Sequence, residues 1–265
     1  MAPLVDQYKA FIIDLDGVVY LLHDPIPGSS EAIRKLQEKG SSFVFLTNNS
    51  VATPEQYVER LAGFDINVEP ELIVTSSQAA GVYLDRNYET AGKTALAIGE
   101  NGLISVLKSR GIEVLDPADC DAPDFVFVGW DRHFDFEKLK AAVVAIRRGS
   151  VFIAMNKDAT YPTPHGLLPG AGTMVAAVST GAGRDPYVVG KPNPFIIELA
   201  LERMGVAKGE TLVVGDRLDS DIEAGIAAGV DTLMVLTGIS SREEIEETGV
   251  RPTHVRDDLK ALFEG

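Results

Sequence analysis

The sequence contains a single cysteine, Cys120, among 265 residues. One cysteine cannot close a disulfide within the chain, so a disulfide-stabilised secreted scaffold is excluded and a reducing, cytoplasmic location is expected. Basic residues are also scarce: 24 Lys and Arg stand against 39 Asp and Glu, which gives a formal net charge of −15. Such a chain is poorly suited to nucleic acid or to an anionic membrane, so neither partner is expected. A small phosphorylated ligand stays compatible where a cation offsets the acids.

Long apolar runs are missing as well. No uninterrupted stretch approaches the ~18–20 residues that span a bilayer. The first residues, "MAPLVDQYK", lack a basic stretch followed by an apolar region, so no signal peptide is expected. Hydrophobic residues make up 45% and charged residues 24% of the sequence, which is ordinary for a globular protein of one large or two modest domains.

Short apolar runs alternate with amphipathic segments along the chain. Runs that end in small polar or acidic residues predict five buried strands, at residues 9–14, 43–47, 72–76, 211–216 and 231–238. Helical patterns lie between them, and this alternation predicts an α/β fold with a parallel sheet covered on both faces. Because ligands of open α/β sheets lie at the carboxyl ends of the strands, the polar strand ends are expected to form the site.

The middle of the chain carries a second set of strand-like and helix-like segments, from "TALAIG" to "VFIAM". We therefore expect an inserted α/β domain at residues 82–183. The core domain would consist of residues 1–81 and 184–265. The insert ends in a long loop, residues 156–172, and loops of this length are often functional.

The first polar strand end, "DLDG", places Asp14 and Asp16 one residue apart. Adjacent carboxylates are hard oxygen ligands that suit Mg²⁺. They can also divide a reaction between them, because one ionised Asp can attack phosphorus while a protonated second Asp donates to the leaving oxygen. An Asp-rich turn closing the strand is the alternative for this motif alone.

A second strand ends in "FLTNNS" and is a candidate phosphate site. Thr47, Asn48 and Asn49 offer a hydroxyl, two amides and backbone N–H groups to phosphate oxygens. In "VVGKPNP", a short turn holds Lys191, which can neutralise a phosphate and a carboxylate together. A polar turn and a surface lysine are the respective alternatives.

The segment "VVGDRLDSDIEAG" places Asp216 directly at a strand end, where it is a candidate metal ligand. Asp219 and Asp221 follow at the start of the next predicted helix, where negative charge suits the helix dipole. Each of the four motifs is a weak or moderate signal. Their joint occurrence in this order, each at a strand end or helix start, is very improbable by chance.

These motifs resemble those of the haloacid dehalogenase superfamily of phosphotransferases, and more narrowly the NagD / para-nitrophenyl phosphatase branch. The resemblance rests on "DLDGVVY" with "PIPG", on "FLTNNS", "NKDATYPTPHGLLPGAG", "VVGKPNP" and "VVGDRLDSDIEAG", and it covers nearly the whole chain. It implies a three-layer, Rossmann-like core with a flap after the first strand. It also implies a large α/β cap inserted between the second and third motifs.

The resemblance also implies roles for individual residues. Asp14 would be the nucleophile that forms an aspartyl-phosphate, and Asp16 would protonate the leaving group and later activate water. Residues 47–49 would hold the phosphoryl group, and Lys191 would bind phosphate and nucleophile.

A metal site is implied as well. Asp14, the backbone carbonyl of Asp16, and Asp216 would bind Mg²⁺, with Asp221 in support. The function expected from these residues is a Mg²⁺-dependent phosphatase acting on a small phosphorylated metabolite. The alternatives are a receiver-like phospho-acceptor without enzymatic turnover, and a phosphotransferase or mutase of the same superfamily. The substrate stays open, and so does the oligomeric state, for which a homodimer is one candidate.

Three residues depart from the family pattern: Leu22 stands where relatives carry Gly, and Met155 and Lys157 stand where relatives often carry Thr and Pro. The cap also offers candidate substrate contacts. These candidates are Trp130, Arg132, Asn156 and Asp158. An exposed loop is the alternative for the segment around Trp130.

Overall fold

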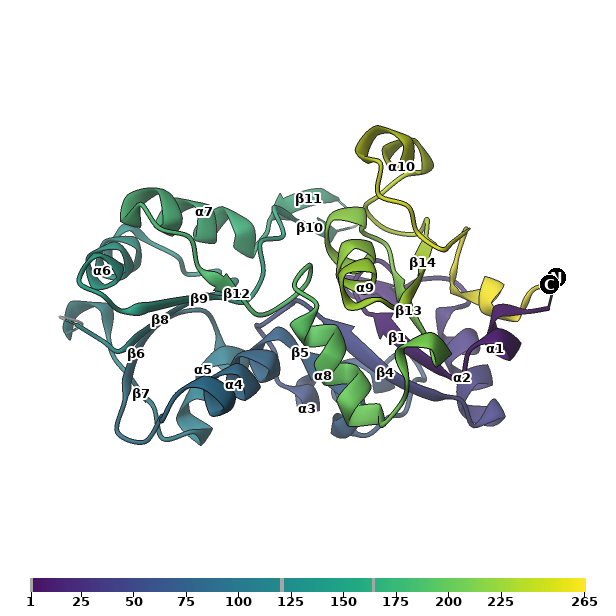
Figure 1. The fold of residues 1–265 in the computed structure, drawn as a ribbon, viewed down its shortest axis with the longest axis horizontal. Coiled ribbons are helices and arrows are strands. Elements are labelled where there is room, and N and C mark those ends of the chain that lie inside the picture. The colour runs from purple at the N-terminus through teal and green to yellow at the C-terminus, as the bar shows by residue number, and fades with distance from the viewer. Residues whose placement is uncertain (1, 120–121, 164) are drawn as a thin grey trace.

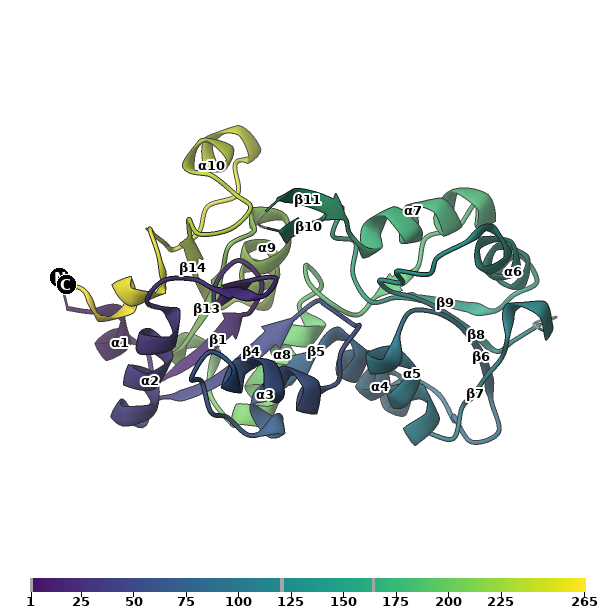
Figure 2. The same ribbon diagram turned by 180° about the vertical axis from the view of Figure 1, so that it is seen from behind.

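The computed structural model describes residues 2–119, 122–163 and 165–265, so Cys120 lies outside the described residues. Two lobes lie side by side along the long axis of the molecule (Figure 1). The chain termini lie together at the far end of one lobe in both views (Figures 1 and 2). In the described part of the chain, no helix is both long and apolar enough to cross a membrane.

The helices and strands alternate as the sequence predicts. The helices are α1 (Leu4–Gln7), α2 (Ser29–Lys39), α3 (Pro54–Ala62), α4 (Ser76–Asn87), α5 (Asn101–Ser109), α6 (Phe136–Arg147), α7 (Ala171–Ala182), α8 (Phe195–Met204), α9 (Glu223–Ala228) and α10 (Arg242–Thr248). The strands are β1 (Ala10–Asp14), β2 (Tyr20–Leu21), β3 (Asp24–Pro25), β4 (Ser42–Thr47), β5 (Ile73–Thr75), β6 (Thr94–Ile98), β7 (Glu113–Val114), β8 (Phe125–Val128), β9 (Val151–Ala154), β10 (Thr160–Thr163), β11 (Gly166–Pro169), β12 (Tyr187–Val188), β13 (Thr211–Gly215), β14 (Asp231–Val235) and β15 (His254–Arg256). A π-helical segment, η4 (Leu218–Ile222), precedes α9.

The first lobe is built on a parallel sheet with the strand order β15-β14-β13-β1-β4-β5. It contains all five strands that the sequence predicts, and β15 is an addition at its edge. Successive side chains of β1 point to opposite faces, so Ile12 packs into one core cluster while Phe11 and Ile13 pack into the other. Both faces are therefore buried, and the predicted α/β fold class is confirmed.

The second lobe contains a smaller parallel sheet with the strand order β12-β9-β8-β6-β7. Side chains of α6 and α7 pack against one face, while α4 and α5 pack against the other. The boundary expected between residues 81 and 82 falls within α4, and β12 follows the boundary expected at 183. The division into residues 1–81, 184–265 and 82–183 stays a prediction.

Two short hairpins lie near the future site: one follows the first strand, and the other lies at the junction of the lobes. The β2–β3 hairpin follows β1, as expected for a flap, and Leu22 adopts φ 55° between its strands. The β10–β11 hairpin belongs to the segment expected to be a loop, and it lies between α7 and α9 in both views (Figures 1 and 2). This second hairpin brings residues from the second lobe to the carboxyl edge of the first sheet.

Candidate active site

The carboxyl ends of three adjacent strands form the floor of the site. Asp14 ends β1 and Thr47 ends β4, while Asp216 directly follows β13, the neighbour of β1 on its other side. These residues line a cavity of about 60 Å³ that also receives residues from the second lobe. Of the residues singled out from the sequence, those that line the cavity are Asp14, Asp16, Thr47, Asn48, Asn49, Trp130, Asn156, Asp158, Lys191, Asp216 and Asp221.

A buried lysine joins two of the acids. Lys191 Nζ lies 2.6 Å from Oδ1 of Asp14 and 2.5 Å from Oδ1 of Asp221, and its side chain is only 3% exposed. Burial alone would lower the pKa of Lys191, but the carboxylates of Asp14 and Asp221 raise it above its ordinary value, so the ammonium stays charged. The lysine therefore offsets part of the negative charge.

Carboxylate oxygens of Asp14, Asp216 and Asp221 lie within 4.8 Å of one another, and all three residues are buried. Oδ2 of Asp216 accepts a 2.7 Å hydrogen bond from the backbone N–H of Ile239. Oδ1 of Asp216 is buried and has no hydrogen-bond partner. A buried carboxylate oxygen without a partner is costly, and hard oxygen donors gathered in this way suit a divalent cation. The donor set fits Mg²⁺.

Burial and the excess of negative charge raise the pKa of two of these acids. Burial raises the pKa of Asp14 well above its usual range, and the nearby carboxylates raise it further against the opposing effect of Lys191. Burial, together with the Asp221 carboxylate, raises the pKa of Asp216 to about 7. Without a further cation, ionisation of the whole cluster is therefore disfavoured.

Asn48 connects three segments of the site through its side-chain amide. Its Oδ1 accepts from the backbone N–H of Lys191 over 2.8 Å. Its Nδ2 lies 3.0 Å from Oδ2 of Asp158, 3.1 Å from the carbonyl of Lys191 and 3.2 Å from Oγ of Ser220. The carbonyl of Asn48 accepts from Nδ2 of Asn156 over 2.7 Å. The amide is thus engaged in holding Lys191 and the second lobe in place.

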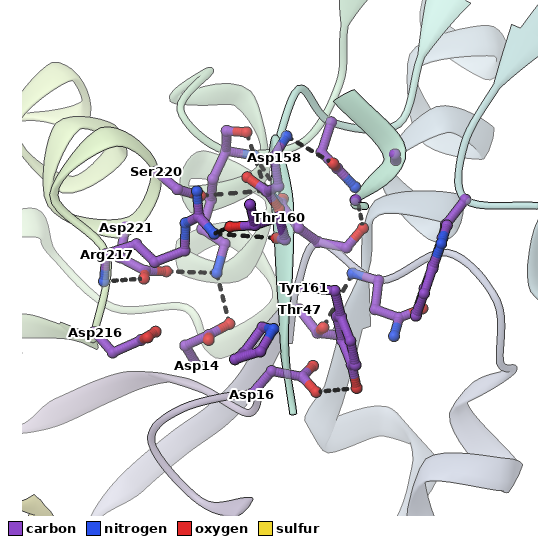
Figure 3. A pocket seen from close by; sticks show the side chains of 18 residues that line it. Asp14, Asp16, Thr47, Asp158, Thr160, Tyr161, Asp216, Arg217, Ser220 and Asp221 are labelled. Atoms are coloured by element: carbon purple, nitrogen blue, oxygen red, sulfur yellow. Dashed lines mark hydrogen bonds and ion pairs between the residues drawn. The ribbon is translucent and has the colours of Figure 1, made fainter. Parts of the chain in front are cut away.

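The Asp16 carboxylate lies apart from the acidic cluster. Its Oδ1 accepts a 2.7 Å hydrogen bond from the hydroxyl of Tyr161 on β10 (Figure 3). Burial raises the pKa of Asp16, while this hydrogen bond opposes the shift. The Tyr161 ring packs against Trp130 with centroids 4.5 Å apart. A carboxyl group with a raised pKa beside the cavity suits proton transfer.

Comparisons with known proteins agree with this arrangement. A model of haloacid dehalogenase-like hydrolases matches residues 11–113, and a HAD-hydrolase-like model matches residues 188–262. An acid sugar phosphatase from Staphylococcus aureus (strain USA300) is 39% identical over 253 residues, which is 96% of this chain and 96% of that protein. The chain belongs to the haloacid dehalogenase-like hydrolases.

Solved structures of similar hydrolases match almost the whole chain. A 4-nitrophenylphosphatase from Thermotoga maritima has a TM-score of 0.89 and 33% identity, and the match covers 99% of this chain and 98% of that one. A glycerol phosphate phosphatase from Mycobacterium tuberculosis, solved in complex with magnesium, has a TM-score of 0.90 and 35% identity, with 100% and 79% covered. The predicted superfamily is confirmed.

Some predicted residues of this haloacid dehalogenase-like hydrolase lie elsewhere or are otherwise engaged. Arg132 does not line the cavity, and its guanidinium lies 2.5 Å from Glu100. Asn49 lines the cavity, but its Oδ1 accepts from the backbone N–H of Val51 over 3.0 Å. Neither Met155, which is fully buried, nor Lys157, which points to Asp185 at 3.8 Å, lines the cavity.

The cavity of the hydrolase also contains residues that the sequence analysis did not single out. Tyr161, Thr160, Ser220 and Arg217 all line the cavity. The Arg217 guanidinium forms two 3.2 Å contacts with the Asp219 carboxylate and donates to the carbonyl of Thr160 over 3.2 Å. Arg217 could have been found from its position in the sequence, because it directly follows Asp216 at the end of a strand.

Proposed function

We propose that this hydrolase cleaves small phosphomonoesters with the aid of Mg²⁺, through an aspartyl-phosphate at Asp14. The observation that carries the proposal is the 2.6 Å contact between Asp14 and Lys191, beside the buried carboxylates of Asp216 and Asp221. A nucleophile, a fixed cation and a cation-binding acid cluster thus meet at one sheet edge. Phosphoryl transfer needs these groups together because its main demand is positioning and charge stabilisation.

The reaction proceeds in two steps. In the first, an Asp14 oxygen forms a bond to phosphorus as the ester P–O bond breaks, and the proton of the Asp16 carboxyl passes to the departing alcohol oxygen. In the second, Asp16 takes a proton from water, whose oxygen attacks phosphorus and releases Asp14 and inorganic phosphate. Lys191 and the hydroxyl of Thr47 hold phosphoryl oxygens. Asn48 positions Lys191 through the hydrogen bonds of its side-chain amide.

Mg²⁺ would be held by Asp14 and Asp216, with the backbone carbonyl of Asp16 and the Asp221 side chain in support. The orphaned Oδ1 of Asp216 supports this assignment. When bound, the ion neutralises negative charge on the phosphate and the acids.

The substrate class follows from the site and from the relatives. The cavity lies between the strand-end acids of the first lobe and Trp130 and Tyr161 of the second, so a leaving group would be enclosed between the two lobes. The relatives are named as acid sugar phosphatase, 4-nitrophenylphosphatase and glycerol phosphate phosphatase. We propose a small phosphorylated metabolite as the substrate and the cytoplasm as the location. A receiver-like role is not favoured, since a receiver would have no second lobe.

The test measures phosphate release from para-nitrophenyl phosphate and from a panel of sugar and polyol phosphates. We expect multiple turnovers with Mg²⁺ and none in EDTA. Asp14→Asn should abolish turnover while the fold, monitored by circular dichroism, is retained. Asp257→Asn is the matched control, because Asp257 is an exposed acid outside the cavity that pairs with Arg242 across 3.3 Å. Near-normal turnover in Asp14→Asn would contradict the assignment of the nucleophile.

A further inference from the structure

Tyr161 reaches from the β10–β11 hairpin of the second lobe to the Asp16 carboxylate at the end of β1 (Figure 3). The hydroxyl donates to Oδ1 of Asp16 over 2.7 Å, and the residue is 8% exposed. In the described part of the chain, no other hydrogen bond is made to that carboxylate. The orientation of the Asp16 side chain therefore depends on one residue that comes from the other lobe.

Several contacts fix Tyr161 where it stands. Its ring packs against Trp130 at 4.5 Å between centroids, with the planes tilted by 37°. Next to it, the carbonyl of Thr160 accepts from Nη1 of Arg217 over 3.2 Å, which fastens β10 to the first lobe. On its other side, Tyr161 pairs with Leu168 of β11. These three contacts hold the Tyr161 ring and backbone in place, so its hydroxyl stays directed at Asp16.

We propose that Tyr161 is a positioning residue that orients Asp16 for proton transfer to the leaving group, an inference that rests on the function proposed above. Because Oδ1 of Asp16 accepts from the tyrosine hydroxyl, the other oxygen, Oδ2, carries the transferable proton. The same hydrogen bond restrains rotation of the carboxyl group. Tyr161 acts through Asp16. Packing of the β10–β11 hairpin on the first lobe brings the tyrosine hydroxyl to the Asp16 carboxyl group.

The effect of Tyr161 on the rate depends on the leaving group. Departure of an alkoxide requires a proton from Asp16 as the P–O bond breaks, because an alkoxide is a strong base. para-Nitrophenolate is a weak base and leaves with little need for a proton. Loss of the tyrosine hydroxyl should therefore slow cleavage of alkyl phosphates far more than cleavage of para-nitrophenyl phosphate.

Tyr161→Phe tests this, because it keeps the ring against Trp130 and removes only the hydroxyl. We expect kcat/KM with glycerol phosphate to fall about tenfold, and kcat/KM with para-nitrophenyl phosphate to fall less than about threefold. Tyr8→Phe is the matched control. Tyr8 also donates to a carboxylate, Oδ2 of Asp231 at 2.9 Å, but outside the site, so both rates should be unchanged.

A second measurement separates orientation of the acid from a general structural role. In an Asp16→Asn background the proton is already missing, so Tyr161→Phe should cause no further loss with glycerol phosphate. Equal losses with both esters, an unchanged rate with glycerol phosphate, or a full additional loss in the Asp16→Asn background would each overturn the inference while the proposed phosphatase stands. If the unmodified protein cleaved neither para-nitrophenyl phosphate nor glycerol phosphate, the proposed function would be overturned, and this inference with it.

Discussion

At the scale of single residues, Lys191 sets the charge balance of the site. Its ammonium lies between the buried carboxylates of Asp14 and Asp221, at 2.6 and 2.5 Å. Breaking a buried ion pair leaves an uncompensated charge, which typically costs about 3–5 kcal/mol. The stability of the site and the phosphate binding proposed above therefore depend on the same side chain.

We expect Lys191→Met to abolish turnover and to lower the free energy of unfolding by roughly 3–5 kcal/mol in EDTA. Methionine fills a similar volume, so the loss would report the charge rather than packing. Urea unfolding and phosphate release measure the two effects. Lys191→Met/Asp221→Asn, which removes one of the stranded carboxylates, should recover part of the stability but none of the turnover. A Lys191→Met protein as stable as the unmodified one would contradict this charge balance.

Residues at strand ends could be predicted from sequence because the sheet itself brings them together. Asp14 and Asp216 follow apolar runs, and neighbouring parallel strands place their ends at one edge. Tyr161 and Arg217 could not be predicted in this way. Tyr161 reaches Asp16 across 145 positions of sequence, and Arg217 reaches Thr160 across 57, through the packing of one lobe on the other. No local pattern encodes that packing.

At the scale of elements, sequence reasoning is least informative at the β10–β11 hairpin. The loop expected at 156–172 contains β10 and β11, and the start of α7. Pro162 and Pro169 lie in these strands, and proline normally argues against a strand. All four residues of β11 are exposed, so no alternation of apolar and polar residues marks it. By contrast, β1, β4, β5, β13 and β14 of the first sheet are mostly buried apolar runs, and the sequence predicts them.

Leu22, one of the departures from the family pattern, has an unfavourable backbone conformation in the flap hairpin. Leu22 adopts φ 55° between β2 and β3, which is the left-handed region that favours glycine. This conformation costs an L-residue roughly 1–2 kcal/mol. Leu22 does not line the cavity, so its effect should be on stability and not on the chemistry.

We expect Leu22→Gly to be more stable than Leu22→Ala by about 1 kcal/mol, because both remove the side chain and only glycine is relieved of the left-handed penalty. The difference is measured by urea unfolding of the two variants side by side. Both should turn over substrate at the rate of the unmodified protein. An alanine variant as stable as the glycine variant would show that the hairpin carries no such strain.

At the scale of the whole molecule, excess acid is partly concentrated in the junction between the lobes. The formal net charge is −15, and the cavity at the junction is lined by acids that include Asp14, Asp16, Asp158 and Asp216. Burial raises the pKa of each of these carboxyl groups. The folded protein therefore binds protons at these acids at a pH where the unfolded chain has released them.

The raised pKa values make the folded protein less stable as the pH rises. The pKa of Asp216 rises from 3.8 to about 7 on folding. Between these values the folded state holds more protons, so the free energy of unfolding in EDTA falls as pH rises, by up to about 1.4 kcal/mol per pH unit. Partly exposed acids whose pKa is lowered by hydrogen bonds, such as Glu100 and Asp124, stabilise the fold at neutral pH and lose this contribution only at more acidic pH.

Mg²⁺ should reverse this trend, because it binds the ionised carboxylates that a high pH favours. We expect the melting temperature in EDTA to be lower at pH 8 than at pH 5.5, and the stabilisation by Mg²⁺ to be larger at pH 8. Burial lowers the pKa of His254, which acts in the opposite direction, so Asp216→Asn serves as the control. That variant should retain the histidine effect, lose much of the decline in EDTA and respond weakly to Mg²⁺. Stabilisation by Mg²⁺ that is greater at pH 5.5 than at pH 8 would contradict a buried acidic metal site.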